Sequence, residues 1–295
     1  MSSRKIDISV VMISYNGERF IRQALDSVLM QQFTGSYEIV MADDKSTDNT
    51  AAIIREYAEK YPDIIRPIYR EKNIGMSNNI YETIRLAKGT YIAICDNDDY
   101  WTDSLKLQKQ YDYMEAHPEC GFICSAAQLV DEQDRQMNIV RTPYVESFVD
   151  LMKSQVDVIA PSIIMRRTQF VQMVADSKWF IDKEYFFDTV WIYWFSYKKA
   201  IHYMPDILTA YRVRSESESH SIDLEKQNKM DKRSWELKVR FMNMHDVDPD
   251  TKYEILSSEY DYLYDTAYYH GLEQVKRSKP YRLGRIIKKL LFWKK

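Results

Sequence analysis

The sequence predicts an α/β fold with a mixed, mainly parallel sheet flanked by helices, followed by a helical C-terminal extension. Short apolar runs rich in β-branched residues alternate with stretches of helical spacing through the first hundred residues. This alternation implies parallel strands with helices on both faces of the sheet. The chain has only 7 Gly and 8 Pro in 295 residues, too few for an all-β fold with many tight turns. Its 45% hydrophobic content suffices for a sizeable core.

One unit, a strand followed by a polar turn and a helix, repeats three times. Its apolar runs are 8–13, 38–42 and 64–69, and the helical spacings that follow them are 20–29, 46–57 and 80–86. A fourth apolar run, 91–95, leads directly into acidic residues. Beyond it we expect a helix at 106–114, strands at 121–127 and 161–166, and a closing hairpin made of 201–205 and 208–212.

Polar residues follow each of the first four strands. They are Ser14, Tyr15 and Asn16, then Asp44, then Asn73 and Asn79, and finally Asp96. Ligands of open α/β sheets bind outside the carboxyl ends of the strands, so we expect these residues to line a nucleotide site. Any one of them alone is more often a turn or a helix cap. Neither a G-x-G-x-x-G nor a G-x-x-x-x-G-K-[ST] motif follows a strand, which argues against a glycine-cradled dinucleotide and a P-loop.

Three carboxylates, Asp96, Asp98 and Asp99, stand together at the end of the fourth strand. Carboxylates this close repel one another unless a proton or a cation intervenes. A hard divalent ion bound by one or two of them and by substrate phosphates is a common solution. We therefore interpret Asp96 and Asp98 as a metal-diphosphate platform. The alternative is a solvated acidic turn in which Asp99 caps the next helix.

A second candidate acid, Asp188, lies among aromatic residues in the stretch 184–191. Aromatic neighbours remove water from a carboxylate, raise its pKa and make it a better base toward a sugar hydroxyl. We expect Asp188 to be the catalytic base, with Asp182 and Glu184 as the next candidates. Asp188 is also a candidate N-cap of the helix that follows, and the two roles are compatible.

Four motifs, Val10–Asn16, Asp43–Asp48, Asn73–Gly75 and Gly89–Asp99, resemble in their order those of family 2 inverting glycosyltransferases with the GT-A fold. The resemblance implies that Asp44 binds the nucleotide base and that Tyr15 stacks near it. It also implies that Asp96 approaches the ribose and that Asp98 ligates Mn or Mg on the diphosphate. Residues 77–79 depart from the pattern, because many relatives carry a basic residue there. Arg70, Lys72 or a residue nearer the C-terminus is then a candidate for the phosphate contact.

The polar loop 215–221 contains His220, a possible additional metal or phosphate contact. A histidine in a serine-rich surface loop is more often simply solvated. We expect three parts of the chain: a glycosyltransferase domain at 1–222, a helical extension at 223–275 and a basic amphipathic tail at 276–295. Within the first part, 1–105 would bind the nucleotide and 106–222 the acceptor.

The tail carries 9 of the 41 basic residues and no Asp or Glu. On a helix its apolar and basic residues would separate into two faces, as in an anchor lying in the membrane plane. The alternative is a basic helix packed on the protein's own acidic surface. No segment is long and apolar enough to span a membrane, and the N-terminus lacks a signal peptide. We expect a cytoplasmic protein, peripheral at the inner face of the cell membrane, that does not bind nucleic acid.

The expected activity is metal-dependent, inverting transfer of a sugar from a UDP-, GDP- or dTDP-sugar to a saccharide or lipid-linked acceptor in bacterial surface glycan synthesis. Asp188 would accept the hydroxyl proton while Mn or Mg on Asp98 stabilises the leaving diphosphate. A catalytically inactive, nucleotide-binding membrane scaffold is the alternative. A sugar nucleotidyltransferase is a weaker one, because residues 14–17 offer neither several glycines nor a lysine.

Overall fold

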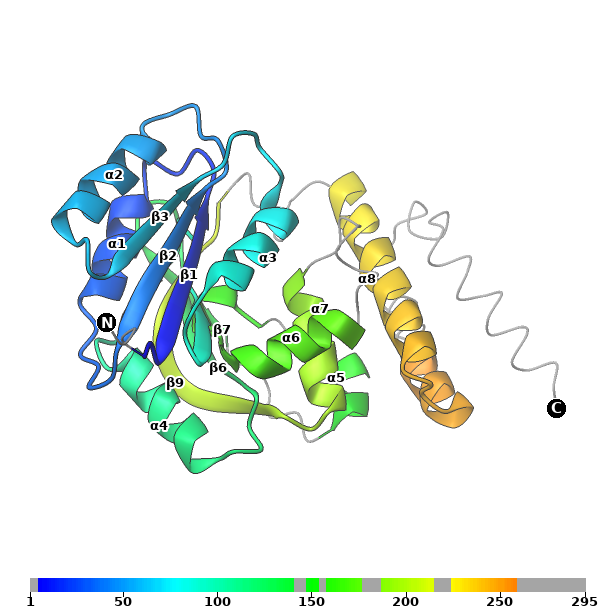
Figure 1. Ribbon diagram of the computed structural model, residues 1–295. Helices are drawn as coiled ribbons and strands as arrows, with labels where there is room; N and C mark the ends of the chain where they lie inside the picture. Colours follow the sequence, from blue (N-terminus) through cyan, green and yellow to red (C-terminus); the bar gives the residue numbers. More distant parts are fainter. Residues whose placement is uncertain (1–4, 141–146, 154–157, 177–186, 215–223, 259–295) are drawn as a thin grey trace. The chain divides into compact units, whose positions relative to one another are not determined.

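The computed structural model describes residues 5–140, 147–153, 158–176, 187–214 and 224–258, with only the backbone described at 187 and 224–233 (Figure 1). The chain forms two compact units. The first comprises residues 1–144 and 157–214, and the second comprises 145–156 and 215–295. The predicted boundary at 222 and the basic tail at 276–295 fall outside the described residues.

Four parallel strands form the nucleotide-binding half of the sheet, in the order β3-β2-β1-β4. They are β1 (Ile8–Ser14), β2 (Tyr37–Asp43), β3 (Ile65–Tyr69) and β4 (Tyr91–Ile94). Strand β1 is completely buried, as its uninterrupted apolar run predicts for a central parallel strand. The register pairs Ser14 with Asp43 and Asp43 with Tyr69, so the polar residues after β1, β2 and β3 emerge at one edge.

The remaining strands make the sheet mixed, as predicted. Strand β8 (Ile164–Arg166) runs antiparallel to both β4 and β6 (Phe122–Val130). Strand β9 (Ile201–Arg212) runs parallel to β6, and the short β5 (Tyr100–Trp101) pairs with its far side. An additional strand, β7 (Gln136–Val140), pairs with β6 in a hairpin that the sequence analysis missed.

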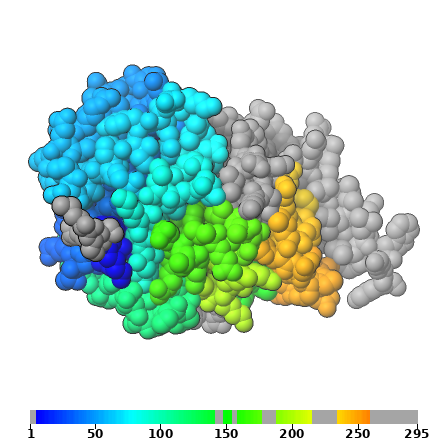
Figure 2. Space-filling model, in the orientation of Figure 1, coloured from blue at the N-terminus to red at the C-terminus, as the bar shows by residue number. Residues whose placement is uncertain are grey.

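Helices cover both faces of the parallel half. Figure 1 shows α1 (Ile21–Leu29) and α2 (Thr50–Lys60) on one face and α3 (Met76–Leu86) on the other. Helix α1 buries Ile21, Ala24, Leu25 and Val28, which recur at the spacing of one helix face. Three further helices are α4 (Lys106–Ala116), α6 (Arg167–Asp176) and α7 (Phe187–Tyr197). Figure 2 shows α3 adjoining α6 at the surface, where the rings of Tyr81 and Phe170 lie 6.4 Å apart.

The predicted hairpin at 201–212 is wrong, because these residues form the single strand β9. The register against β6 jumps from Met204 to Ile207, so Pro205 and Asp206 bulge out of the ladder. Proline lacks the N–H that a ladder requires and is tolerated at such a bulge. The predicted strand at 161–166 is also shorter than expected, since residues 160–162 form a 3-10 turn before β8 begins.

The second unit is helical in its described residues. It contains α5 (Phe148–Lys153), α8 (Leu224–Met244) and a further helical stretch at 249–258. The rings of Phe148 and Phe241 lie 5.9 Å apart, and Lys153 forms an ion pair with Glu254. Among the helices described in either unit, none has the length and apolar character needed to cross a bilayer.

Candidate active site

The loops after β1 and β2 are tied together at the carboxyl edge of the sheet. The backbone N–H of Asn16 donates to Ser46 Oγ at 2.9 Å, and Asn16 Oδ1 accepts the N–H of Thr47 at 2.8 Å. The N–H of Gly17 donates to Thr50 Oγ1 at 2.8 Å. Asn16, a predicted nucleotide contact, therefore uses its amide oxygen to bind the neighbouring loop. Its backbone is left-handed, with a φ of 50°.

The Asp44 carboxylate organises the loop after β3. It is 3% exposed, and its two oxygens accept the backbone N–H groups of Ile74 and Gly75, each at 2.9 Å. Asn73 Oδ1 accepts the same Gly75 N–H at 3.0 Å. Each carboxylate oxygen can accept more than one hydrogen bond, so a base contact by Asp44 would add to these bonds.

Asn79 faces the protein interior. It is 1% exposed, its Oδ1 accepts the Nε–H of Arg70 at 3.1 Å, and its Nδ2 lies 3.4 Å from the Ala42 carbonyl. Arg70 also donates from Nη2 to Thr83 Oγ1 at 3.1 Å. Asn79 thus positions an arginine at the sheet edge, beside the strand end where a phosphate contact was expected from Arg70.

Tyr15 and Ser14 differ sharply in environment. Tyr15 is 50% exposed, which leaves a ring face open for stacking. Ser14 is 3% exposed, and neither its Oγ nor the Oδ1 of the adjacent buried Asp43 has a hydrogen-bond partner within the described residues. The edge between β1 and β2 therefore carries polar atoms that a ligand or water could satisfy.

An acid cluster forms where β4 ends. Asp96 is half-buried, and burial followed by the negative charges of Asp98 and Asp188 raises its pKa to about 7. Asp188 lies in the first turn of α7, where its Oδ1 accepts the N–H of Thr189 at 2.7 Å. A helix distant in sequence thus brings Asp188 within electrostatic reach of Asp96. The other base candidates, Asp182 and Glu184, and the possible ligand His220 lie outside the described residues.

Asp99 is buried, 2% exposed, rather than solvated. Its Oδ1 accepts the backbone N–H of Arg212 at 2.7 Å, whereas its Oδ2 has no partner within the described residues. Burial, followed by the charges of Asp98 and Asp96, raises the pKa of Asp99 well above its ordinary value. The alternative of a solvated turn that caps the next helix is therefore wrong for Asp99, and α4 begins after Asp103, which accepts the Leu105 N–H.

Two arginines that the sequence did not single out, Arg212 and Arg214, contact the acidic loop after β4. Arg212, 1% exposed, donates from Nε to the Asp98 carbonyl at 2.9 Å and from Nη2 to Gln23 Oε1 at 2.7 Å. Arg214 donates from Nη1 to Asp98 Oδ2 at 3.0 Å. The sequence could have indicated that these two arginines act together, because residues i and i+2 of an extended chain point to the same side.

The donor chemistry of Asp98 fits Mn²⁺ or Mg²⁺, which prefer carboxylate and phosphate oxygens. The crowding of Asp96, Asp98 and Asp188 disfavours their joint ionisation, which the raised pKa of Asp96 expresses, and a bound cation would relieve this repulsion. Within the described ranges no three His, Cys, Asp or Glu side chains form a complete cation site on their own. One or two carboxylates completed by substrate phosphates would be the corresponding arrangement.

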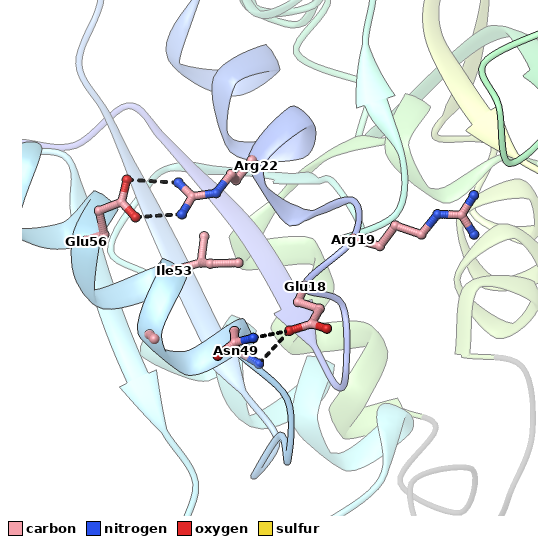
Figure 3. Close-up of a pocket in the computed structure, with 7 residues that line it drawn as sticks. Glu18, Arg19, Arg22, Asn49, Ile53 and Glu56 are labelled. Atoms are coloured by element: carbon pink, nitrogen blue, oxygen red, sulfur yellow. Dashed lines mark hydrogen bonds and ion pairs between the residues drawn. The ribbon is translucent and has the colours of Figure 1, made fainter.

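A separate groove of about 800 Å³ lies between α1 and α2 (Figure 3). Arg22 donates to both oxygens of Glu56, at 2.8 and 2.6 Å, and Asn49 donates twice to Glu18 Oε2, at 2.8 and 2.6 Å. Arg19 points away from these pairs in Figure 3 and instead bonds Glu132. Because its charged groups pair with one another, we interpret the groove as a structural feature.

The family model for "Glycosyl transferase family 2" matches residues 9–170. An uncharacterized Mycobacterium tuberculosis protein, Rv1520, is 50% identical over 112 residues, which cover 38% of this chain and 32% of the relative. The putative teichuronic acid biosynthesis glycosyltransferase TuaG of Bacillus subtilis is 30% identical over 157 residues, which cover 53% of this chain and 61% of TuaG. The matched stretches therefore span less than two thirds of either relative.

Two solved structures share the fold. The S. aureus protein TarS 1-349 in complex with UDP-GlcNAc has a TM-score of 0.58 at 16% identity, over 88% of this chain and 81% of TarS. The Pyrobaculum calidifontis mannosyltransferase PcManGT in complex with GDP-Man and Mn²⁺ has a TM-score of 0.55 at 16% identity, over 96% of this chain and 83% of the other. The predicted GT-A fold is thereby confirmed, and at this identity the likeness concerns the fold alone.

Proposed function

The chain belongs to glycosyl transferase family 2, and on this basis we propose that it is a metal-dependent, inverting glycosyltransferase. It would move a sugar from a nucleoside-diphosphate sugar to a hydroxyl group of a saccharide or lipid-linked acceptor. The observation that carries this proposal is the meeting of Asp188 with the Asp96 and Asp98 corner, expressed in the raised pKa of Asp96. Asp188 on α7 and the acids after β4 can act on the same substrate only if they lie at one site, and their electrostatic proximity meets this requirement.

The donor would lie along the carboxyl edge of the parallel strands. Tyr15 would stack near the base, and Asp44 would accept a hydrogen bond from the base in addition to holding the loop after β3. Asp96 would approach the ribose. Asn16 and Asn73 would shape the site through the loops they contact, and Asn79 through Arg70. Ser14, whose Oγ has no partner within the described residues, would lie at the base of the site. The donors bound by the structural relatives, UDP-GlcNAc and GDP-Man, support a UDP- or GDP-sugar, and a dTDP-sugar fits the same contacts.

Asp188 would act as the general base. It would accept the proton of the acceptor hydroxyl as that oxygen bonds to the anomeric carbon, while the bond from this carbon to the diphosphate breaks. Asp98 would hold Mn²⁺ or Mg²⁺, which when bound supplies Lewis-acid stabilisation to the nucleoside diphosphate as it leaves. Attack opposite to the leaving group inverts the anomeric configuration.

The acceptor class is proposed by analogy with TuaG, whose name assigns it to teichuronic acid biosynthesis. A bacterial surface polysaccharide, such as a capsule or lipopolysaccharide chain, would be the product. We further propose that the basic tail, 276–295, attaches the protein to the inner leaflet of the cell membrane. Sedimentation with anionic and with neutral vesicles tests the attachment: equal binding to both kinds of vesicle, or to neither, would contradict it.

The proposed reaction is tested by incubating the protein with UDP-GlcNAc, UDP-Glc or GDP-Man, Mn²⁺ and a panel of saccharide acceptors. The products are examined by NMR, which reports the anomeric configuration. We expect a glycosidic product of inverted configuration, lost in Asp188→Asn and kept in Asp63→Asn, a matched change at an exposed acid. A product of retained configuration would refute the single-displacement mechanism. Nucleotide binding without transfer to any acceptor would instead favour the inactive scaffold.

A further inference from the structure

The side chain of Asp98, the proposed metal ligand, already has a cationic partner. Arg214 Nη1 lies 3.0 Å from Asp98 Oδ2, and the two side chains are 31% and 25% exposed, respectively. The backbone carbonyl of the same aspartate accepts the Nε–H of Arg212. One arginine thus fixes the main chain of this corner, while the other neutralises its carboxylate.

The ring of Phe20 positions both guanidinium groups. The Arg212 guanidinium carbon lies 4.4 Å from the ring centroid, and that of Arg214 lies 5.8 Å from it. Phe20 is 9% exposed, so its ring offers the guanidinium groups a packed aromatic surface. A planar guanidinium over an aromatic face keeps its orientation when one hydrogen-bond partner leaves. Arg19 lies over the same ring at 4.6 Å but pairs with Glu132 instead of Asp98.

A divalent cation on Asp98 would compete electrostatically with the present Arg214 contact. Arg214 Nη1 lies 3.0 Å from Asp98 Oδ2. A doubly charged ion on the same carboxylate would therefore stand a few ångströms from the guanidinium and repel it. The displaced guanidinium would still lie beside the metal, where the diphosphate of a nucleotide would bring two or more negative charges. Arginine binds phosphate oxygens in a fork geometry, so this second partner suits it at least as well as the first.

We propose that Arg214 is the counterion of Asp98 in the metal-free protein, that a divalent cation displaces it, and that it then pairs with the diphosphate of the bound nucleotide. The inference rests on the proposed function, because it requires a metal and a nucleoside diphosphate at this site. Its consequence is cooperativity. The metal alone binds against the Arg214 ion pair, whereas metal and nucleotide together satisfy both Asp98 and Arg214.

The test compares binding with and without nucleotide. Isothermal titration calorimetry measures the affinity of the full chain for Mn²⁺ alone and for UDP or GDP in the presence of saturating Mn²⁺. For Arg214→Ala we expect Mn²⁺ alone to bind about five-fold more tightly, since the competing ion pair is gone. We expect the nucleotide to bind about ten-fold more weakly, since its arginine contact is gone.

Arg19→Ala is the matched control, because it removes an arginine from the same Phe20 ring without touching Asp98. The affinities of Arg19→Ala for Mn²⁺ alone and for the nucleotide with Mn²⁺ should each stay within about two-fold of wild type, as expected for a substitution that does not interact with the site. Arg214→Lys retains the charge and should fall between wild type and alanine in both titrations. Thermal unfolding without ligands confirms that each variant is folded before it is titrated.

The proposal is supported if Arg214→Ala binds Mn²⁺ alone more tightly than wild type and binds the nucleotide more weakly. Unchanged or weaker binding of Mn²⁺ alone, or an unchanged affinity for the nucleotide, would overturn it. If the Arg214→Ala titrations overturn the exchange but wild type still binds a nucleotide only with Mn²⁺ and Asp98→Asn does not, the metal and nucleotide platform survives while the Arg214 exchange fails. If wild type binds neither nucleotide with Mn²⁺, the proposed function fails and the inference fails with it.

Discussion

Replacing Asp96 by Asn should stabilise the metal-free protein at neutral and alkaline pH but not in acid. The folded state raises the pKa of Asp96 from 3.8 to about 7. Between these values the folded protein holds a proton that the unfolded chain releases, so the free energy of unfolding of wild type falls as pH rises. Three pH units correspond to at most about 4 kcal/mol, and partial solvation of the half-buried carboxylate reduces this to about 2 kcal/mol.

Urea unfolding of wild type and Asp96→Asn at pH 4.5 and pH 8, with chelator present, measures this difference. We expect the variant to be more stable by about 2 kcal/mol at pH 8 and nearly equal at pH 4.5. Asp63→Asn, at an exposed acid, should show no such change between the two pH values. A stability difference between wild type and Asp96→Asn that is the same at both pH values would refute the account of crowded charges around Asp96.

Three further predictions concern catalysis, the core and the loops. Asp188→Asn should lower kcat by about a thousand-fold while nucleotide affinity by calorimetry stays near wild type, and turnover above a tenth of wild type would rule out the general base. Lys106 is fully buried, and burial lowers its pKa to about 7. The unfolded chain binds more protons from pH 7 to 10.5, so the free energy of unfolding of wild type rises over this range. The stability of Lys106→Met relative to wild type should therefore fall by about 2 kcal/mol from pH 7 to pH 10 in urea unfolding. A pH-independent difference would contradict this. A methyl group at Gly17 would lie 1.8 Å from Asn97 Nδ2, so the Asn97 side chain must turn away in Gly17→Ala. This variant should weaken nucleotide binding about three-fold, and the additional change Asn97→Gly should restore it. A double variant no better than the single one would show that the loops do not meet through this contact.

The parallel half of the sheet was predictable because its signals are local. The apolar runs that became β1 to β4 are each short, β-branched and followed by polar residues, so strand and strand end can be identified without knowledge of the fold. Asp96 and Asp188 were predicted as site residues from similar local signals, the first from its place after a strand and the second from its aromatic surroundings. Their proximity, in contrast, required the fold.

What the sequence could not indicate is which partner a polar side chain chooses. Asn16 and Asn79 stand where ligand contacts were expected, yet they bind a neighbouring loop and an arginine. Arg212 and Arg214 reach Asp98 only because β9 returns to the sheet beside β5, a pairing between residues far apart in the chain. Pro205 shows the same limit, since it suggested a turn between two strands but sits in a bulge of one strand.

The central claim is that Asp98 belongs to a metal-dependent nucleotide site. Thermal shift with UDP, GDP and dTDP, each with and without Mn²⁺, on wild type and Asp98→Asn tests it most directly. We expect one nucleotide to raise the Tm of wild type by several degrees only when Mn²⁺ is present. A shift of this size corresponds to a nucleotide concentration of about 100 times its Kd. The same shift should be absent in Asp98→Asn. A shift of equal size in the variant, or no shift with any nucleotide, would contradict the claim.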